Sequence, residues 1–477
     1  MTTPEGTTVS SCEAGGRNGQ GRLPSWRWEA LRTTFWLVPT IFVLIAGILF
    51  VLTFEIDWAV YHRHLSLPFW IVRGSADAGR EVLIGIAAAV ITVVGVVFSV
   101  TIVALTLASQ QFGPRMMRNF VRDVGNQVTL GVFVATFVYS ILTLVAITAT
   151  SGGAFVPHLS ITVSEALVLV DLAVLIYFIH HIAKSIQLPE VIAAIAADLV
   201  RAIDAEFPDA VSVGRAAAVG EGRSLSDLSS LVDGHGAPVA AGVSGYLQFV
   251  GYAQLIEIAT RTDSTIRLEH RPGHFIVAGR PLAMVWPPEA ASHVALALTK
   301  AHVTGPHRTL MQDPVFAIDQ LVEIAIRALS AAVNDTFTAL TCIDWLTAGL
   351  SRVSGRTLAE GVYRDREGRI RLIESNPSYA RMVNRAFDKI RQASRGMPAV
   401  IIRLIDALAT IGGETHSPEQ RRVLLCQAEA ILRSAEESVP DPNDREEIRT
   451  RYRRLLRRMA AGGASGEPAP TGEELEH

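Results

Sequence analysis

The chain has 477 residues, of which 49% are hydrophobic and 19% are charged, whereas a soluble globular protein carries about 25% charged residues. This composition, with a mean hydropathy of +0.31, predicts that much of the chain lies in a membrane. The formal net charge of −3 argues against nucleic-acid binding, because no global basic field exists. The 3 cysteines are widely spaced, which argues against a disulfide framework or a zinc site.

Four apolar segments are long enough to cross a bilayer, since a spanning helix needs about 20 mostly apolar residues. Within a transmembrane domain at 34–187, these segments are Phe35–Thr53, Val82–Ala108, Val128–Thr148 and Ile161–Ile182. The polar tail 1–33 resembles no signal peptide, so the first span is expected to be a retained anchor. The tail itself is expected to be disordered and cytoplasmic.

The basic residues near the span ends predict the orientation. The tail carries Arg17, Arg22, Arg27 and Arg32, the loop after the second span carries further arginines, and Lys184 follows the fourth span. The loop after the third span, 151–160, has no basic residue. Both termini are therefore expected to be cytoplasmic.

Small and hydroxyl-bearing residues recur every seven positions in two spans, so each set forms one stripe along its helix. In the second span the set is Gly85, Thr92, Ser99, Thr106 and Gly113; in the third it is Thr129, Thr136, Thr143 and Thr150. One interpretation is a packing seam between helices. The other is that the hydroxyls, above all those of Ser99, Thr106, Thr136 and Thr143, line a hydrated path.

Asp171 falls near the centre of the fourth span, where a carboxylate is costly and faces a bundle interior, a partner or water. No Lys or Arg lies within a span to neutralise it. Its expected partner is a stripe hydroxyl, the Tyr139 phenol, water or its own proton. The same observation fits an ion path and a structural interhelical hydrogen bond.

From Leu188 onward the charge rises, which predicts a cytoplasmic α+β domain at 188–460. Residues 212–238 are expected to be a linker or mobile loop, 243–287 a small β module, 289–460 mostly helices with a hairpin at 362–372, and 461–477 a disordered tail. The run from Arg271 to Leu282 resembles the turn-strand-turn repeat of barrel-sandwich hybrid domains. The run has no lysine that could be modified, so the resemblance implies a fold and no cofactor.

The stretch from Arg308 to Ala339 includes Asp313, Asp319, Glu323, Arg327 and the pair Asn334-Asp335. With the Ser-Gln-Gln-Phe-Gly-Pro-Arg exit of the second span, it resembles an uncharacterised family of bacterial predicted membrane proteins defined by a domain of unknown function. Family members often have prolines where this chain has Ala331 and Thr336. The resemblance implies the four-span architecture and a bacterial inner-membrane location, but no mechanism.

The residues of this motif favour a structural interpretation. Asp319, Glu323 and Arg327 are four residues apart and can form a ridge of ion pairs on one helix. Asp335, after Asn334, is placed to cap the next helix. Alternatively, Asp313 and the other carboxylates bind a divalent cation or a ligand. Arg308, with two nearby histidines, is expected to be solvated.

These observations predict a membrane protein that is not an enzyme and has no cofactor or metal. The first hypothesis is an ion or small-solute channel with a cytoplasmic regulatory domain, resting on Asp171 and the stripes. The alternative is a membrane-anchored scaffold or sensor whose cytoplasmic domain binds a partner or ligand. A homo-oligomer in the bilayer is expected in the first case, because one four-span bundle has few polar faces. An anchored metal-dependent enzyme is least favoured, because no nucleophile accompanies the acids.

Overall fold

The computed structural model describes most of the chain. The described residues are 36–63, 71, 74–112, 123–150, 153–185, 187–207, 224–354, 356, 361–375, 378–415 and 417–464. The expectations for the tail 1–33, for the Gly-Pro-Arg exit of the second span and for residues 465–477 lie outside them.

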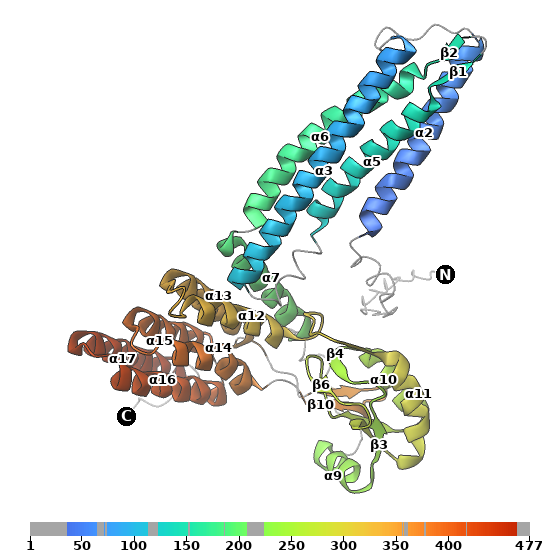
Figure 1. Cartoon of the computed structure of the whole chain (residues 1–477). Helices are drawn as coiled ribbons and strands as arrows, with labels where there is room; N and C mark the ends of the chain where they lie inside the picture. Colours follow the sequence, from blue (N-terminus) through green and yellow to red (C-terminus); the bar gives the residue numbers. More distant parts are fainter. Residues whose placement is uncertain are drawn as a thin grey trace, which may run out of the picture.

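The described residues contain four helices that are long and apolar enough to cross a membrane, which confirms the predicted spans. They are α2 (Leu37–Arg63), α3 (Ala76–Phe112), α5 (Val124–Ala146) and α6 (His158–Ser185). The helices run up and down in one bundle, and the antiparallel strands β1 (Thr148–Thr150) and β2 (Gly153–Phe155) join α5 to α6. We call the end with β1 and β2 the far end, and the end facing the globular domain the near end (Figure 1).

Helix α5 is the centre of the bundle, because it packs against α2, α3 and α6. Gly131 of α5 lies directly against the ring of Phe42 of α2, where an added Cβ would come within 2.9 Å of it. The close approach of the two backbones follows from the small residue. The helix therefore presents one face to each neighbour and buries its polar side chains among them.

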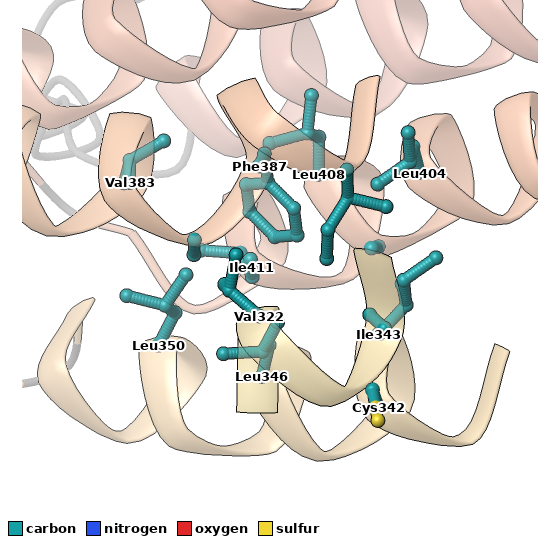
Figure 2. Packing of buried hydrophobic residues seen from close by; sticks show 14 of the residues in the cluster. Val322, Cys342, Ile343, Leu346, Leu350, Val383, Phe387, Leu404, Leu408 and Ile411 are labelled. Atoms are coloured by element: carbon teal, nitrogen blue, oxygen red, sulfur yellow. The ribbon is translucent and has the colours of Figure 1, made fainter. Parts of the chain in front are cut away.

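The last membrane helix is followed by α7 (Leu188–Glu206), which packs against α12 and α13 of the helical part. The helices of this part are α12 (Pro314–Ala328), α13 (Thr336–Ser354), α14 (Tyr379–Ala393), α15 (Pro398–Gly413), α16 (Pro418–Ser438) and α17 (Pro442–Ala464). Their apolar faces meet in one core, in which Leu346, Phe387 and Leu408 are fully buried (Figure 2). Helix α17 includes residues 461–464, which the sequence placed in a disordered tail.

The β module contains two sheets, with strand orders β3-β7-β5-β10-β9 and β6-β4-β8. Its elements in chain order are α9 (Leu225–His235), β3 (Ala237–Ala240), β4 (Gly245–Val250), α10 (Tyr252–Arg261), β5 (Thr265–Leu268), β6 (Phe275–Ile276), β7 (Pro281–Trp286), the short 3-10 helix η1 (Pro288–Ala290), α11 (Ala291–Ala301), β8 (His302–Gly305), β9 (Val362–Arg364) and β10 (Ile370–Glu374). Helices α10 and α11 pack against these strands and complete a second core.

Two features of the module differ from the sequence prediction. The expected linker 212–238 contains α9 and the first two residues of β3, because Leu228 and Val232 of α9 bury apolar side chains. The hairpin of β9 and β10 belongs to the five-stranded sheet, where β10 pairs in parallel with β5. The chain thus leaves the module, builds α12 and α13, and returns to it.

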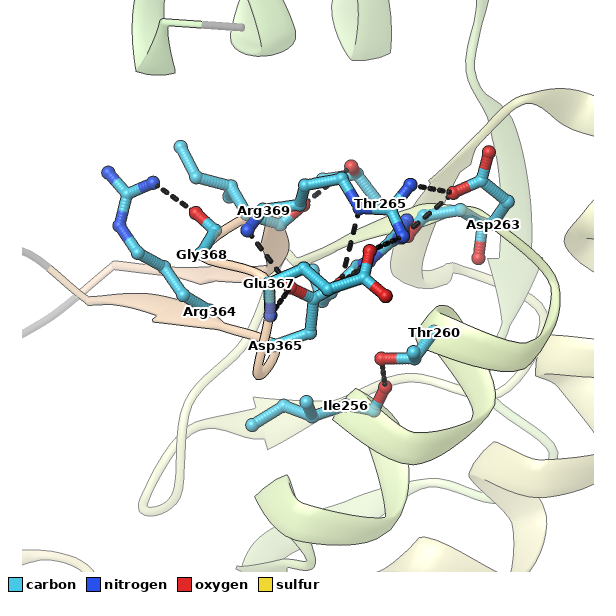
Figure 3. A network of polar contacts seen from close by, with 12 residues as sticks. Ile256, Thr260, Asp263, Thr265, Arg364, Asp365, Glu367, Gly368 and Arg369 are labelled. Atoms are coloured by element: carbon cyan, nitrogen blue, oxygen red, sulfur yellow. Dashed lines mark hydrogen bonds and ion pairs between the residues drawn. The ribbon is translucent and has the colours of Figure 1, made fainter. Parts of the chain in front are cut away.

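Polar contacts fix this returning hairpin to the module (Figure 3). The Arg371 guanidinium donates to Asp365 at 2.7 Å and to Asp263 at 2.8 Å. The side chains of Arg371 and Asp365 are only 4% and 3% exposed. Buried charges of opposite sign are stable only as a pair, so these bonds specify where the hairpin sits.

Candidate functional site

The stripe of the second span lies on the outside of the bundle. Ser99 and Thr106 are exposed, whereas the buried positions of α3 include Gly79, Leu83, Ala87, Val90, Val97 and Ala104. The Thr106 hydroxyl donates to the carbonyl of Ile102 in its own helix, at 2.9 Å. The interpretation that this stripe closes a seam within one subunit is therefore wrong. Gly113 and the side chain of Thr150 lie outside the described parts.

The stripe of the third span lies inside the bundle and reaches Asp171. Thr129, Thr136 and Thr143 are each at most 1% exposed. The Thr136 hydroxyl donates to Asp171 Oδ1 at 3.0 Å, which confirms a stripe hydroxyl as a partner of this carboxylate. The structure thus brings Asp171 and Thr136 together, places Thr143 two turns further along α5 beside Tyr139, and leaves Ser99 and Thr106 on the outer face of α3.

A chain of polar side chains continues from Asp171 toward the far end. One turn beyond Thr136, the fully buried Tyr139 shares a hydrogen bond of 2.8 Å with Thr53 of α2. The Tyr139 hydroxyl also has Ser160 and Asp57 as polar neighbours. Buried polar side chains therefore extend from the middle of the bundle to its far end, although no hydrogen bond joins Thr136 to Tyr139.

Asp57 terminates this polar chain at the N-terminus of α6. Its carboxylate accepts hydrogen bonds from the backbone N–H groups of Leu159 and Ser160, both at 2.9 Å, and from the Ser160 hydroxyl at 2.8 Å. A carboxylate at this position satisfies the free N–H groups and complements the helix dipole. The sequence prediction placed Asp57 in a loop, because the first span was expected to end at Thr53.

Several buried oxygens of the bundle have no hydrogen-bond partner among the described residues. They are Asn126 Oδ1, Thr129 Oγ1, Ser140 Oγ, Ser164 Oγ and Asp171 Oδ2. Most buried polar atoms in proteins are bonded to protein or to ordered water. Such oxygens are places where an ordered water can bind in the bundle interior.

Apolar side chains separate this polar chain from the near end. Phe133 lies one turn from Thr136, and Phe178 lies two turns from Asp171, each 2% exposed. They belong to a cluster with Val90, Val97, Ala104 and Ile182. We call this cluster the apolar plug.

At the near end of the bundle, Asp123 and His181 are joined by a hydrogen bond. His181 Nε2 lies 2.8 Å from Asp123 Oδ2, while Asp123 Oδ1 accepts from the Gly125 N–H and caps α5. Adjacent histidines face different directions on a helix, so the sequence favours interfacial solvation of His180 and His181 over a shared metal. That is wrong for His181, which is half-buried, and fits His180, which is exposed.

In the globular domain, the residues of the predicted motif bind arginines. Arg308 donates to Asp313 at 2.8 Å and also bonds Asp319, which pairs in addition with Arg385 of α14. The Arg308 side chain is only 16% exposed, so the expectation that it is solvated is wrong. The guanidinium also lies 5.0 Å above the Phe316 ring. Glu323 and Arg327 lie further along α12 and have interaction partners of their own.

Asn334 and Asp335 form the turn before α13. Asn334 has a φ of 50°, in the left-handed region that Asn tolerates better than most residues. Asp335 accepts hydrogen bonds from the Thr338 N–H at 3.1 Å and from its hydroxyl. The pair thus has the geometry of the helix cap that its sequence suggests. The described residues contain no group of His, Cys, Asp and Glu arranged to hold a metal ion.

Comparison with known proteins places this architecture in a family. The family described as "Predicted membrane protein (DUF2254)" matches residues 32–410. An uncharacterised protein of Mycobacterium bovis is 33% identical over 380 residues, covering 78% of this chain and 71% of the relative. Uncharacterised proteins of two Mycobacterium tuberculosis strains match to the same extent. The chain belongs to the DUF2254 family.

The match to the DUF2254 family includes the membrane helices, the β module and the helical part as far as α15. It therefore contains both Asp171 and the Asp313–Asp335 motif. No solved structure matches the chain, so the geometry described above is the basis for any functional conclusion about this DUF2254 protein.

Proposed function

We propose that the four-helix bundle conducts protons and that Asp171 is the group through which they pass. The observation that carries the proposal is the buried carboxylate of Asp171, whose Oδ2 has no partner among the described residues. Its Oδ1 bonds Thr136, which lies one turn from the hydrogen-bonded group of Tyr139, Thr53, Ser160 and Asp57. An ionisable residue inside a membrane usually marks an ion or proton path. Such a protein conducts rather than catalyses.

A proton fits this interior better than a larger ion. Thr136, Ser140, Thr143 and Ser164 are each at most 1% exposed, so their side chains leave little room for a hydrated metal cation. A proton moves along hydroxyls, carboxyls and single waters without an open pore. The apolar plug then represents the closed state, and hydration of the space beside Phe133 and Phe178 would connect Asp171 to the near end.

Purified protein in liposomes containing a pH-sensitive dye tests the proposal. Proton flux driven by a potassium diffusion potential is expected for the natural chain, and Asp171→Asn is expected to reduce it roughly tenfold or more, which corresponds to about 1.4 kcal/mol in a barrier. Glu165→Gln is the matched control on the same helix. Absence of flux from the natural chain at every potential and pH tried would contradict conduction and favour the anchored scaffold or sensor.

The proposed assembly is a homo-oligomer in which α3 contacts a second subunit. The outer face of α3 carries Gly85, Gly95 and Ser99, and a Cβ added to either glycine would meet no atom within 4 Å. Small residues on lipid-exposed faces allow helices of different subunits to approach closely. This arrangement would place Ser99 and Thr106 at a subunit interface and leave the path through Asp171 within each subunit.

The proposed location is the bacterial inner membrane, with the globular domain and both termini in the cytoplasm. An even number of spans places the start of α2 and the start of α7 on the same side. The arginines of the tail 1–33 favour the cytoplasm for that side. Reporter fusions at residues 151–152 and after residue 464 test this orientation, and a cytoplasmic signal at 151–152 would contradict it.

A further inference from the structure

Exposed apolar side chains gather at the turn between α12 and α13. Phe337, in the first turn of α13, is 82% exposed, which is more than any large apolar side chain of the four membrane helices. Val333, four positions earlier, is 54% exposed, and Ala331 and Ala332 are exposed beside it. We call residues 331–337 the apolar tip. Neighbouring apolar side chains that a fold leaves exposed mark a surface that contacts a protein or a membrane.

The apolar tip carries only one ionisable residue, Asp335. Its carboxylate accepts hydrogen bonds from the N–H group of Thr338 at 3.1 Å and from the hydroxyl of the same residue. The cost of moving a polar group out of water falls when its hydrogen bonds are made within the protein. The tip therefore suits the boundary between lipid headgroups and acyl chains, where a carboxylate can stay partly hydrated.

The packing of α13 against α7 sets the position of the apolar tip. A Cβ added to Gly349 of α13 would lie 2.6 Å from Cδ2 of Leu199 in α7. Further along both helices, Arg352 Nε donates to Asp204 Oδ1 at 2.6 Å. Both contacts follow the same order along the two helices, so α7 and α13 run in parallel. The start of α13, with Phe337, therefore lies beside the start of α7.

The start of α7 is close to the membrane, because Leu188 follows only three positions after Ser185, the last residue of α6. Leu188 precedes Leu199 by 11 residues, and Thr338 precedes Gly349 by the same number. At a rise of about 1.5 Å per residue, Thr338 is level with Leu188. The apolar tip thus lies beside the point at which the chain leaves the last membrane helix.

Helix α12 leads to the same position from the other side of the tip. Glu206, the last residue of α7, lies near Asp313 and Pro314, where α12 begins. Since α7 and α12 also pack together, α12 runs back along α7 toward the bundle. It contacts the membrane helix α3 as well, and Figure 1 shows α12 and α13 next to the near end. Both helices therefore present the tip to the membrane side of the globular domain.

We propose that the apolar tip inserts into the bilayer interface at the near end of the bundle, with Phe337 as its anchor. Lipid is the occupant that the position favours, because the tip adjoins membrane helices whose exposed side chains are themselves apolar. A phenylalanine ring at the boundary of headgroups and acyl chains removes apolar surface from water. The contact would hold α12 and α13 against the membrane beside α7. It does not depend on what the bundle conducts.

Spin labels on the full chain in phosphatidylcholine liposomes test this inference. Cys12 and Cys426 are replaced by serine, the buried Cys342 is kept, and one nitroxide at a time is attached to an introduced cysteine. Val333→Cys reports on the tip with Phe337 intact. Oxygen concentrates in the bilayer whereas a nickel chelate stays in water, so the ratio of their collision rates with the label distinguishes lipid from water.

Two further labels give the reference values. Ala348→Cys is the water reference, because it is exposed on α13 about 15 Å beyond Thr338. Leu44→Cys, 62% exposed on α2, is the lipid reference. The oxygen-to-nickel ratio at residue 333 is expected to be several-fold above that at 348 and to approach that at 44. A ratio equal to that at 348 overturns the proposal, and so do low collision rates with both reagents, which would place the tip against a second copy or another protein.

A substitution of the anchor completes the test. In the chain labelled at 333, Phe337→Asp is expected to lower the ratio to the value at 348, because a charge at this position disfavours the interface. Phe337→Leu, which stays apolar, is the matched control and should keep the high ratio. The exposed position tolerates both changes without loss of core packing. An unchanged ratio in Phe337→Asp would refute the anchor, and no proton flux is measured, so the result is independent of the conduction proposal.

Discussion

At the scale of single residues, the same amino-acid type has different roles according to its surroundings. Asp171 lies in the middle of the bundle with one hydroxyl donor and a free oxygen. Asp57, equally buried at 4% exposed, has backbone donors for both of its oxygens and forms a helix cap. The complete set of donors fits a structural role for Asp57, whereas the free oxygen of Asp171 supports its proposed role in proton transfer.

Removal of the Asp57 cap is expected to destabilise the bundle. Asp57→Ala leaves the first N–H groups of α6 without their acceptor, so we expect a loss of about 1–2 kcal/mol in the free energy of unfolding. Thermal unfolding in detergent measures the change. Asp77→Ala is the control, because the Asp77 side chain is 90% exposed. Equal stability of the two variants would show that the Asp57 bonds contribute little.

The pKa of Glu374 predicts a pH dependence of stability. Burial and Glu206 raise this pKa from the ordinary 4.5 to about 7, while the Tyr252 bond and Arg271 lower it. The folded state therefore binds the proton more tightly than the unfolded state, so the stabilisation is complete below pH 4.5 and is lost as the pH rises through about 7. We expect the Tm of the natural chain to fall as the pH rises through about 7, and this fall to be smaller in Glu374→Gln. The exposed Glu289→Gln variant should show the same fall in Tm as the natural chain.

At the scale of elements, burial distinguishes two patterns with the same period. In α3, Val90, Val97 and Ala104 repeat every seven residues and are buried, and so are Thr129, Thr136 and Thr143 in α5. Ser99 of α3 lies two positions after Val97 and faces outward. A sequence shows that residues share a face, but the packing of the bundle decides which face is inside.

The hairpin of β9 and β10 depends on its buried charges. Asp365→Ala would leave the Arg371 guanidinium buried without its closest acceptor, so we expect a loss of about 3 kcal/mol. Hydrogen exchange of residues 361–375 should then increase, because the hairpin opens more often. Glu367→Ala provides the control on the same hairpin, since Glu367 is 69% exposed. Unchanged protection in Asp365→Ala would show that β-sheet pairing alone holds the hairpin.

At the scale of the whole molecule, two successive helices join the membrane bundle to the globular domain. Helix α6 carries Asp171, and α7 follows it after a short break and packs against α12 and α13. Helix α3 also contacts α12 of the helical part. The proposed proton path thus lies beside a helix that leads into the globular domain (Figure 1).

The proposed oligomer predicts crosslinking through α3. With the natural cysteines replaced, Ser99→Cys is expected to give a disulfide-linked dimer in membranes under mild oxidation, because Ser99 lies on the outer face of α3. Leu44→Cys, which is 62% exposed on α2, is the comparison. A bulky Ser99→Leu should weaken assembly without unfolding the subunit. A monomeric mass in several mild detergents, together with no crosslink, would refute the oligomer.

The sequence by itself determined the four spans, the position of Asp171 in the last of them and the existence of a small β module, since these depend on apolar length and local alternation. The Asp335 turn also followed from local sequence, because a helix cap involves neighbouring residues. Only the tertiary structure decided the contacts between residues distant in sequence. In the tertiary structure the stripe of α3 faces outward and His181 lies within hydrogen-bond distance of Asp123. Arg308 is buried there, and β10 lies beside β5 in the sheet. Periodicity defines which residues share one face of a helix or strand. The element against which that face packs depends on how all the elements pack together.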